Sequence, residues 1–386
     1  MKREPDEPIR VMRIIARMNI GGPAVQVAGL MRGFNVNEFH HRLYTGFCGQ
    51  NEADFLELSA VDVQATRIQG LGRRISILSD VRAFIALVRH IRTFKPHIIH
   101  THTAKAGFLG RIASLVSLHR SIRIHTFHGH LLQGYFGKFG RILVVVTEKT
   151  LALFTHYLLA VGNKVRSDLL EVGIGTKENF GLMPPGLEIA KLPSKMSSRN
   201  ALDLSESELY CGFIGRVNQI KRPDRFLDVV SELKKRNLEL SFFIAGDGEL
   251  LNHCYHRIKS EFLRVKLLGW QSDMERILSA ADMVVLTSDN EGMPLSLIQA
   301  GMSGLPVVAT NVGSVSEIVI EGETGFVTSL DVVEIADALE KLVKSEKLRN
   351  YFGKNAKNLT LHKFGVERLV LDHEKLYRNL MIKFIS

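Results

Sequence analysis

Cysteine is scarce and scattered in this sequence of 386 residues. The three cysteines, Cys48, Cys211 and Cys254, are far apart and odd in number, and no CxxC pair occurs. A disulfide framework or a zinc ribbon needs closely spaced cysteine pairs, so neither is indicated. The composition, with 45% hydrophobic and 23% charged residues, is that of an ordinary globular protein and excludes a disordered or collagen-like chain.

Long apolar runs are also lacking. The N-terminus, MKREPDEPIRVMR, has no apolar signal core. The most apolar stretch, 142–162, is interrupted by Glu148, Lys149 and His156, whereas a membrane span needs about 20 apolar residues. This stretch instead predicts a helix followed by a buried strand, and we expect a cytoplasmic protein.

Acidic residues are few in the first half of the chain. Residues 1–200 hold 27 basic and 14 acidic side chains, whereas residues 201–386 hold 23 and 26. A basic half beside a nearly neutral half predicts two domains that face different partners, one of them anionic. Nucleic acid, an anionic membrane surface and phosphorylated substrates are the alternatives that this asymmetry leaves open.

Short apolar runs alternate with amphipathic segments, which predicts βαβ units and parallel sheets. The expected strands lie at 11–18, 41–47, 97–102, 122–126, 157–161, 209–214, 240–245, 264–268, 282–287 and 305–309. Helices are expected at 222–236, 248–260, 273–280 and 294–303, among others. Residues 191–207 are polar and aperiodic, which is typical of a linker. The expected fold is therefore α/β, with two doubly wound domains that bind ligands at the carboxyl ends of their strands.

Segment 75–94 has the most regular helical spacing. Its apolar residues are Ile77, Leu78, Val81, Phe84, Ile85, Val88 and Ile91. Arg82, Arg89 and Arg92 occupy another face. The spacing predicts a helix that packs its apolar face on the core and leaves a basic face in solvent. A helix lying on a membrane surface is the alternative.

The first candidate site is a glycine pair. Gly21 and Gly22 follow the first strand and precede a helix, where backbone N–H groups face an anion. An ordinary tight turn is the alternative. Neither this pair nor the Gly246–Leu251 segment completes a GxGxxG fingerprint, which disfavours a nicotinamide-dependent enzyme.

Two further candidates follow strands of the second domain. Arg216 and Lys221 flank a strand-to-helix loop, where two cations suit a diphosphate; two exposed loop charges are the alternative. Glu291 precedes a helix with proline in its first turn. Its carboxylate suits sugar hydroxyls, and the free N–H groups of residues 292–295 suit hydroxyls or phosphate.

Five motifs occur together in this order: GGP after strand one, PHIIHTHTAKAG at 96–107, HTFHGH at 125–130, GR-xxxx-K at 215–221, and EGMPLSLIQA at 291–300. Their combination resembles the retaining glycosyltransferases of family 4, over residues 11 to 380. The resemblance implies the GT-B fold, two Rossmann-like domains facing a cleft, with no metal ion and no cofactor. The expected domains are 1–190 for the acceptor, the linker 191–207, 208–365 for a nucleotide-sugar donor, and a helix at 366–386 that crosses back to the first domain.

The resemblance also implies roles for single residues. Gly21 and Gly22 match the glycine loop that faces the donor phosphate, and Arg216 and Lys221 match the diphosphate-binding pair. The remaining matches are Glu291 at the transferred sugar with its neighbours Gly292, Met293, Pro294 and Leu295, His128 at the active-site edge, and Leu268 and Trp270 near the nucleobase.

One position departs from the family. The second Glu of the Glu–seven residues–Glu motif, which holds the ribose hydroxyls in the family, is Gln299 here. A glutamine amide still donates and accepts hydrogen bonds. It lacks the stronger charge-assisted acceptor, so we expect donor affinity or nucleotide preference to differ.

The histidine-rich segments offer a competing site. His97, His100 and His102, with those at 125, 128 and 130, have the ring type that binds zinc. Neither run contains Asp, Glu or Cys, and six histidines exceed a four-ligand site. Strand alternation places His100 and His102 on one face and leaves His97 elsewhere.

The expected reaction moves a sugar from a nucleotide diphosphate sugar, UDP by family preference, to the hydroxyl of an acceptor glycan or a lipid-linked saccharide. Aromatics and cations interleaved at 130–141 suit a membrane interface, as does the basic half; a loop folded on its own domain is the alternative. We therefore expect an enzyme of polysaccharide or glycolipid synthesis, peripheral on the inner face of the membrane. A nucleotide-sugar epimerase of the same architecture is the alternative function. Nucleic acid is not an expected partner, because the basic residues are dispersed.

Overall fold

The computed structural model describes residues 7–50, 52–72, 74, 76–129 and 138–385. The chain divides into two compact units. Unit 1 comprises residues 1–187 together with 365–386, and unit 2 comprises residues 188–364. Both units are α/β structures, as predicted.

Unit 1 contains, within its described residues, a seven-stranded sheet in the order β3-β2-β1-β4-β5-β6-β7. Every pairing in the sheet is parallel. Its strands are β1 (Ile9–Arg17), β2 (Phe39–Gly46), β3 (Ala65–Arg67), β4 (Ile98–His102), β5 (Ile122–Phe127), β6 (Tyr157–Ala160) and β7 (Phe180–Leu182). Because parallel strands are covered on both faces, they are largely apolar, and this pattern made β1 predictable.

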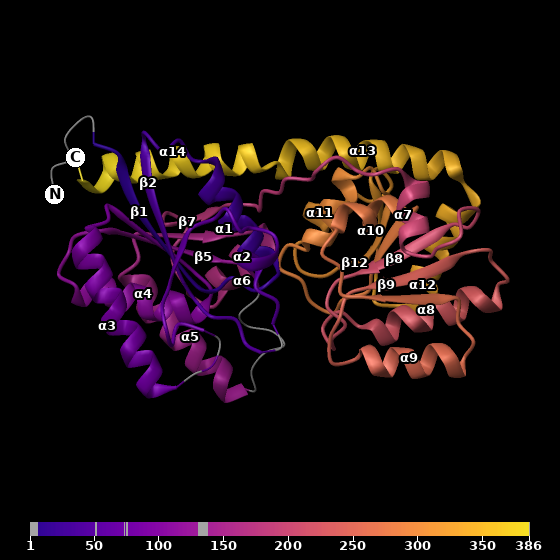
Figure 1. Ribbon diagram of the computed structural model, residues 1–386, viewed down its shortest axis with the longest axis horizontal. Helices are drawn as coiled ribbons and strands as arrows, with labels where there is room; N and C mark the ends of the chain where they lie inside the picture. Colours follow the sequence, from indigo (N-terminus) through magenta and orange to yellow (C-terminus); the bar gives the residue numbers. More distant parts are fainter. Residues whose placement is uncertain (1–6, 51, 73, 75, 130–137, 386) are drawn as a thin grey trace. The chain divides into compact units, whose positions relative to one another are not determined.

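Helices cover both faces of this sheet (Figure 1). They are α1 (Gly22–Gly33), α2 (Phe55–Leu58), α3 (Ile77–Phe94), α4 (Ala104–Val116), α5 (Lys138–Leu153), α6 (Asn163–Glu171) and α14 (Val366–Ile385). Buried side chains of α3 and α4 pack on one face, and those of α1 and α14 pack on the other. The C-terminal helix thus shares a core with the first strand of the chain.

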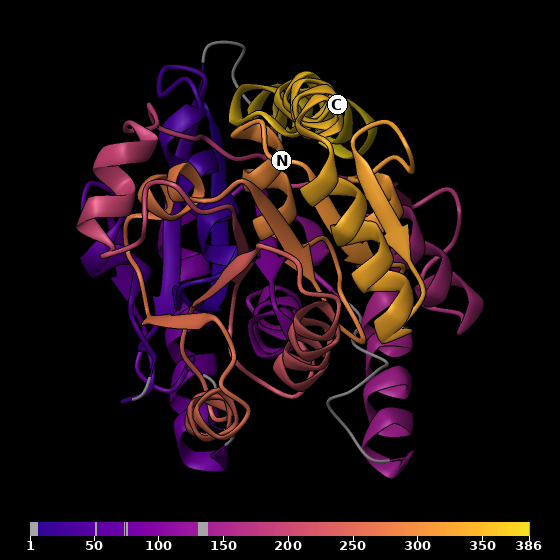
Figure 2. The same cartoon turned by 90° about the vertical axis from the view of Figure 1, so that its right-hand side faces the viewer.

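Unit 2 contains, in the part that the structure describes, a six-stranded parallel sheet in the order β10-β9-β8-β11-β12-β13. The strands are β8 (Tyr210–Ile214), β9 (Ser241–Ala245), β10 (Val265–Gly269), β11 (Met283–Leu286), β12 (Val307–Thr310) and β13 (Gly325–Thr328). The helices are α7 (Lys195–Ala201), α8 (Pro223–Lys235), α9 (Leu251–Ser260), α10 (Met274–Ala280), α11 (Leu295–Met302), α12 (Val332–Lys344) and α13 (Glu346–Phe364), with a 3₁₀ turn at Val315–Glu317. Figure 2 shows the strands of this unit between their helix layers.

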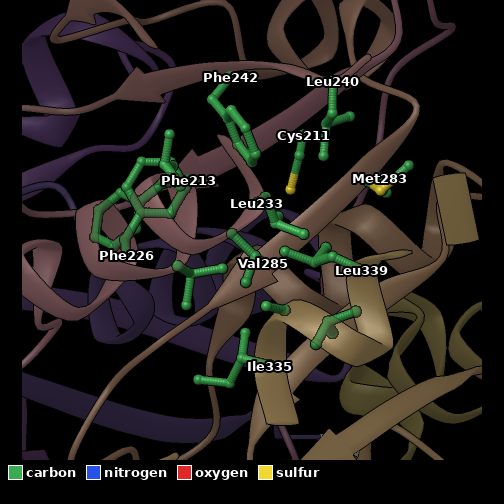
Figure 3. Packing of buried hydrophobic residues seen from close by; sticks show 14 of the residues in the cluster. Cys211, Phe213, Phe226, Leu233, Leu240, Phe242, Met283, Val285, Ile335 and Leu339 are labelled. Atoms are coloured by element: carbon green, nitrogen blue, oxygen red, sulfur yellow. The ribbon is translucent and has the colours of Figure 1, made fainter. Parts of the chain in front are cut away.

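A hydrophobic core of unit 2 lies between the sheet and α8, α9 and α12. Phe213 and Phe242 of the sheet meet Phe226 of α8 there (Figure 3). Cys211 is fully buried in the same core. Burial raises the pKa of its thiol well above the usual value, so Cys211 acts as a small apolar packing residue rather than a nucleophile.

The predicted orientation of the 75–94 helix is wrong for its first half. The buried residues of α3 are Ala83, Leu87, Ile91 and Phe94. The first-half apolar residues are exposed instead, namely Ile77, Leu78, Val81 and Ile85. Apolar residues occupy more than half of the circumference of this helix, so the spacing alone did not determine which stripe meets the sheet. Arg82 and Arg89 border the exposed stripe and are exposed as well.

The predicted linker 191–207 also needs correction. Its middle forms α7, which Ser194 caps by accepting a hydrogen bond from the Ser197 N–H (3.2 Å). Arg199 of this helix is 3% exposed and bonds the Asp282 carboxylate at 2.6 Å. A seven-residue helix held by a buried ion pair has no apolar period, and the segment therefore resembled a linker in sequence.

Candidate functional site

The loop after β8, which carries Arg216 and Lys221, is fixed by the backbone of the loop after β9. The Gly215 N–H donates to the Ala245 carbonyl at 3.0 Å, and the Val217 N–H donates to the Asp247 carbonyl at 2.9 Å. A Cβ at Gly246 would lie 1.9 Å from the Gly215 carbonyl oxygen. The Gly246–Gly248 turn therefore serves to let two loops approach closely.

Glu291, in the loop after β11, meets Lys221 from the neighbouring loop. Its Oε1 accepts hydrogen bonds from Lys221 Nζ and from Ser288 Oγ, the latter at 2.6 Å. Both side chains of the ion pair are largely buried, with 20% of Lys221 and 10% of Glu291 exposed. Because β8 and β11 are adjacent in the sheet, two residues 70 positions apart meet at its carboxyl edge.

Gly313 makes room for the Glu291 loop. Its φ is +55°, and a Cβ there would lie 1.6 Å from the Glu291 carbonyl oxygen. The Ser314 N–H donates to the Gly292 carbonyl at 3.3 Å. The backbone of the loop after β12 thus packs against and supports the backbone of the loop that carries Glu291.

Arg216 differs from Lys221 in its surroundings. Its side chain is exposed, and among the described residues its guanidinium has no hydrogen-bond or ion-pair partner. One unpaired guanidinium and one ammonium paired with a carboxylate lie on the same loop. Guanidinium groups bind phosphate oxygens in a bidentate manner, so this edge of unit 2 can hold an anion.

The other predicted residues of unit 2 follow β10 and β11. Met293 and Pro294 are buried, and α11 begins at Leu295 with no side-chain cap on its first N–H groups. Gln299 lies further along this helix and is partly exposed. Leu268 lies near the end of the edge strand β10 and Trp270 directly follows that strand, with 43% of its surface exposed.

In unit 1 the glycine pair lies at the junction of β1 and α1. Gly21 is the N-cap of α1 and Gly22 is its first residue. Among the described residues, a Cβ built at Gly21 would have only the Asn19 carbonyl oxygen nearby, at 4.0 Å, so these residues leave the space in front of this backbone open. No described side chain caps the first N–H groups of α1, which leaves them available to an anion.

His128 follows β5 at the same carboxyl edge. Its Nε2 lies 2.9 Å from Nδ1 of His102, the last residue of the adjacent strand β4. Burial, and next the charge of Arg13, lower the pKa of His128 to about 3. The ring is therefore neutral near pH 7.

The histidine-rich strands do not converge on a metal site. Within the described residues, no three His, Cys, Asp or Glu side chains are grouped so as to hold a metal ion. His100 and His102 stack at 4.4 Å between ring centroids, whereas His97 bonds the Arg10 N–H through Nδ1 at 3.0 Å. The alternation argument thus places these three rings correctly.

Both units match models of one kind of enzyme. The family model "Glycosyl transferase 4-like domain" matches residues 21–186, and "Glycosyl transferases group 1" matches residues 194–359. The chain is a family 4-type glycosyltransferase.

Two relatives match most of the length of this glycosyltransferase. The "UDP-Gal:alpha-D-GlcNAc-diphosphoundecaprenol alpha-1,3-galactosyltransferase" of Escherichia coli is 28% identical over 85% of this chain and 86% of that protein. The "Capsular polysaccharide biosynthesis glycosyltransferase CapM" of Staphylococcus aureus is 23% identical over 85% of this chain and 89% of that protein.

Solved structures agree on the fold of this glycosyltransferase. Sucrose-phosphate synthase from Thermosynechococcus elongatus is similar with a TM-score of 0.83 and 19% identity, covering 97% of this chain and all of that one. Anabaena HepE in complex with UDP and glucose has a TM-score of 0.80 and 19% identity, covering 96% and 99%. The fold is GT-B, as predicted.

Three residues were not identified from the sequence, namely two at the Glu291 loop and one inside β1. Ser288 bonds Glu291 from three residues earlier in the same loop, whereas Gly313 acts on that loop through a tertiary contact. No motif in the sequence marks either role. Arg13 carried a usable signal, because a charged residue inside an otherwise apolar, buried strand is unusual.

Part of the predicted membrane interface is not described by the structure. Residues 130–137 of the predicted interface 130–141 lie outside the described residues. Of the helices that are described, none combines the length and the apolar character required to cross a bilayer.

Proposed function

We propose that this glycosyltransferase is retaining and transfers a sugar from a UDP-sugar to a hydroxyl of a lipid-linked saccharide. The observation that carries the proposal is the Lys221–Glu291 pair beside the unpartnered Arg216 at the carboxyl edge of unit 2. A cation is needed at the leaving diphosphate and a carboxylate at the sugar hydroxyls, and this edge supplies both. The family models favour transfer over the epimerase alternative.

The chemical task is to stabilise the charge that develops on the departing phosphate. The bond between the anomeric carbon and the β-phosphate oxygen breaks, and the acceptor oxygen bonds the same face of that carbon. The acceptor proton passes to the departing phosphate oxygen, so the products are the glycoside and the nucleoside diphosphate. In this proposal Arg216 and Lys221 hold the diphosphate, and Glu291 orients the sugar.

Single substitutions test this assignment. We expect Arg216→Ala and Lys221→Ala each to lower kcat by about 10²–10³-fold, the usual loss for one preorganised donor. Lys235→Ala is the matched control, because Lys235 is 76% exposed at the far end of α8. Unchanged release of nucleoside diphosphate in both loop variants would refute the charge-stabilising role.

The UDP assignment is supported by a relative that is named for UDP-Gal and by a structural neighbour solved in complex with UDP. A panel of UDP, GDP and ADP tested for protection against thermal unfolding decides it. A nucleotide at 100 times its Kd adds about 2.7 kcal/mol to the free energy of unfolding. Protection by GDP or ADP alone would contradict the proposal.

A lipid-linked acceptor requires the enzyme to work at a membrane surface, and exposed side chains of unit 1 support this. The exposed stripe of α3, Ile77, Leu78, Val81 and Ile85, is bordered by exposed arginines. The first turns of α5 also expose apolar side chains beside cations, namely Arg141, Ile142, Leu143, Val146 and Lys149. The first turns of α3 and α5 lie on the same side of unit 1 in both views (Figures 1 and 2).

Charge complementarity favours an anionic bilayer as the occupant of this surface. Unit 1 carries 28 Lys and Arg against 16 Asp and Glu, a net +12, whereas unit 2 carries 22 against 24. Each Lys or Arg near an anionic surface contributes about 1 kcal/mol to binding. The structure thus favours the membrane-surface alternative for segment 75–94.

Cosedimentation with vesicles tests this surface. We expect binding to vesicles that contain phosphatidylglycerol at low salt, and loss of binding to pure phosphatidylcholine. Ile77→Ser combined with Leu78→Ser should weaken binding, whereas the control Phe262→Ser, at a residue of unit 2 that is 82% exposed, should not. Equal binding by the double variant and the wild type would place the membrane contact elsewhere.

A further inference from the structure

Arg13 is a cation buried in the middle of β1, with none of its surface exposed. No carboxylate among the described residues forms an ion pair with it. Its Nη1 faces His102 Nε2 at 3.2 Å and His100 Nδ1 at 3.5 Å, and its Nη2 donates to the Tyr377 hydroxyl at 3.0 Å. Burying a charge without a counter-charge costs stability, so stability alone does not explain this arginine.

The contacts of Arg13 determine which ring nitrogen of His102 carries a proton. A guanidinium has only donors, so His102 Nε2 must accept. The proton of the neutral ring is then on Nδ1, which lies 2.9 Å from His128 Nε2. The His102 Nδ1–H therefore donates to His128 Nε2.

The same reasoning applies one step further to His128. Because its Nε2 accepts, the single proton of the neutral His128 ring is on Nδ1. Among the described residues, His128 Nδ1 has no hydrogen-bond partner. We propose that Arg13 and His102 are positioning residues that hold His128 in the Nδ1–H tautomer, so that a ligand of unit 1 meets an N–H donor at this ring. This proposal rests on the proposed function, under which the ligand atom is an oxygen of the nucleotide sugar.

The C-terminal helix holds Arg13 in the orientation that this chain of hydrogen bonds requires. Tyr377 of α14 accepts from Arg13 Nη2, and its hydroxyl lies 2.7 Å from His100 Nδ1. His100 Nδ1 also faces Arg13 Nη1, so it accepts and the Tyr377 hydroxyl donates to it. His100 Nε2–H then donates to Thr126 Oγ1 at 2.7 Å. Each of these hydrogen bonds therefore has one consistent choice of donor and acceptor.

Nuclear magnetic resonance of protein labelled with ¹⁵N-histidine tests the tautomer directly. Two-bond ¹H–¹⁵N correlations distinguish protonated from unprotonated ring nitrogens, and loss of a signal in His128→Gln assigns the ring. We expect the His128 proton on Nδ1 at pH 7 without any substrate. A proton on Nε2 would overturn the proposal. This spectrum needs neither a position 102 variant nor activity, so its outcome is independent of the proposed function.

Two substitutions of His102 separate positioning from packing. His102→Asn places an amide N–H near the position of Nδ1, whereas His102→Gln places it near Nε2 and removes the donor to His128. We expect the Asn variant to keep the His128 tautomer and the Gln variant to lose it. In the Gln variant kcat should fall at least roughly tenfold with KM for the donor nearly unchanged; a wrong tautomer costs about 10⁴-fold where histidine moves protons.

A purely structural role for His102 predicts a different result. Both variants would then lose activity equally, in step with their thermal stability, and the His128 spectrum would be the same in each. That result would overturn the proposal.

Discussion

At the scale of single residues, the candidate site of unit 2 depends on backbone room as much as on charge. Glu291 is held by Lys221 and Ser288 at its carboxylate, but its loop lies where it does because Gly313 has no side chain. A charged side chain can be predicted from a motif, whereas the glycine behind it acts through a contact 22 residues away in sequence. This is why the motif analysis found Lys221 and Glu291 and missed Gly313.

Gly322 serves as a control for the close contact that Gly313 makes. Both have positive φ, +72° at Gly322 and +55° at Gly313, but a Cβ at Gly322 would have nothing within 4 Å. We expect Gly322→Ala to cost about 1–2 kcal/mol of backbone strain without loss of transfer activity. Gly313→Ala should add the displacement of the Glu291 carbonyl and lower activity severely. Chemical denaturation and initial rates measure the two effects, and wild-type activity in Gly313→Ala would contradict this view of the loop.

Gln299 is the position where the sequence departs from its family, and its partly exposed place on α11 leaves it accessible to a ligand. A carboxylate forms charge-assisted hydrogen bonds that are roughly twice as strong as those of an amide. We therefore expect Gln299→Glu to tighten UDP binding by about tenfold, or about 1.4 kcal/mol, as measured by calorimetry. Unchanged affinity would place the ribose hydroxyls away from this side chain.

At the scale of elements, the sequence identified strands better than helix faces. The strands predicted for both units are present. Strands of a parallel sheet are buried on both sides and are therefore rich in apolar residues, which makes them recognisable in the sequence. β3 and β7 have three residues each, too few to form a pattern. Neither of these two strands nor β13 (Gly325–Thr328) was predicted. The buried face of α3 was misassigned because this helix has apolar residues on two adjacent stripes, and their spacing alone does not show which stripe packs on the sheet.

α5 shows how a helix that exposes apolar residues is nevertheless fixed to its unit. Glu148 of α5 bonds Arg111 of α4 at 2.7 Å, with 4% and 1% of the two side chains exposed. Removing one partner leaves an unpaired buried charge, so we expect Glu148→Ala to lower the free energy of unfolding by about 3–5 kcal/mol. The measurement is chemical denaturation.

The control for Glu148 is an exposed pair in the same unit. Asp372 bonds Arg368 at 2.8 Å on α14 and is 46% exposed. Its replacement by alanine should cost less than about 1 kcal/mol. Similar losses in the two variants would mean that the Arg111–Glu148 pair is more hydrated than its burial indicates.

At the scale of the whole molecule, the two units differ in where their titratable groups lie. Unit 1 buries His100, His102, His125 and His373, whose pKa values lie below the usual range mainly because of burial. In unit 2 the carboxyl groups of Glu261 and Glu340 have pKa values lowered by their hydrogen bonds to Arg257 and Lys344. Acid therefore acts on the two units in different pH ranges.

The sign of the effect in unit 1 follows from linkage. A histidine that is neutral when folded and has a pKa near 6.5 when unfolded contributes its full stability above about pH 6.5. That stability is lost as the pH falls toward the folded pKa, which is about 3 for His373. Each such histidine lowers the free energy of unfolding by about 1.4 kcal/mol per pH unit below 6.5. The carboxylates of unit 2 lose their contribution only below about pH 4.5.

We therefore expect unit 1 to lose stability between pH 6.5 and 5 while unit 2 keeps its own. Hydrogen exchange measured by mass spectrometry reports the two units separately, with faster exchange expected in β1, β4 and α14 first. His373→Gln should reduce the pH slope of unit 1, whereas His253→Gln, at an exposed position on α9, should not. Because the buried histidines lie near Arg13, a unit 1 that keeps its stability over this pH range would mean that the cluster admits water and protons in the folded protein. The neutral tautomer of His128 would then lose its physical basis.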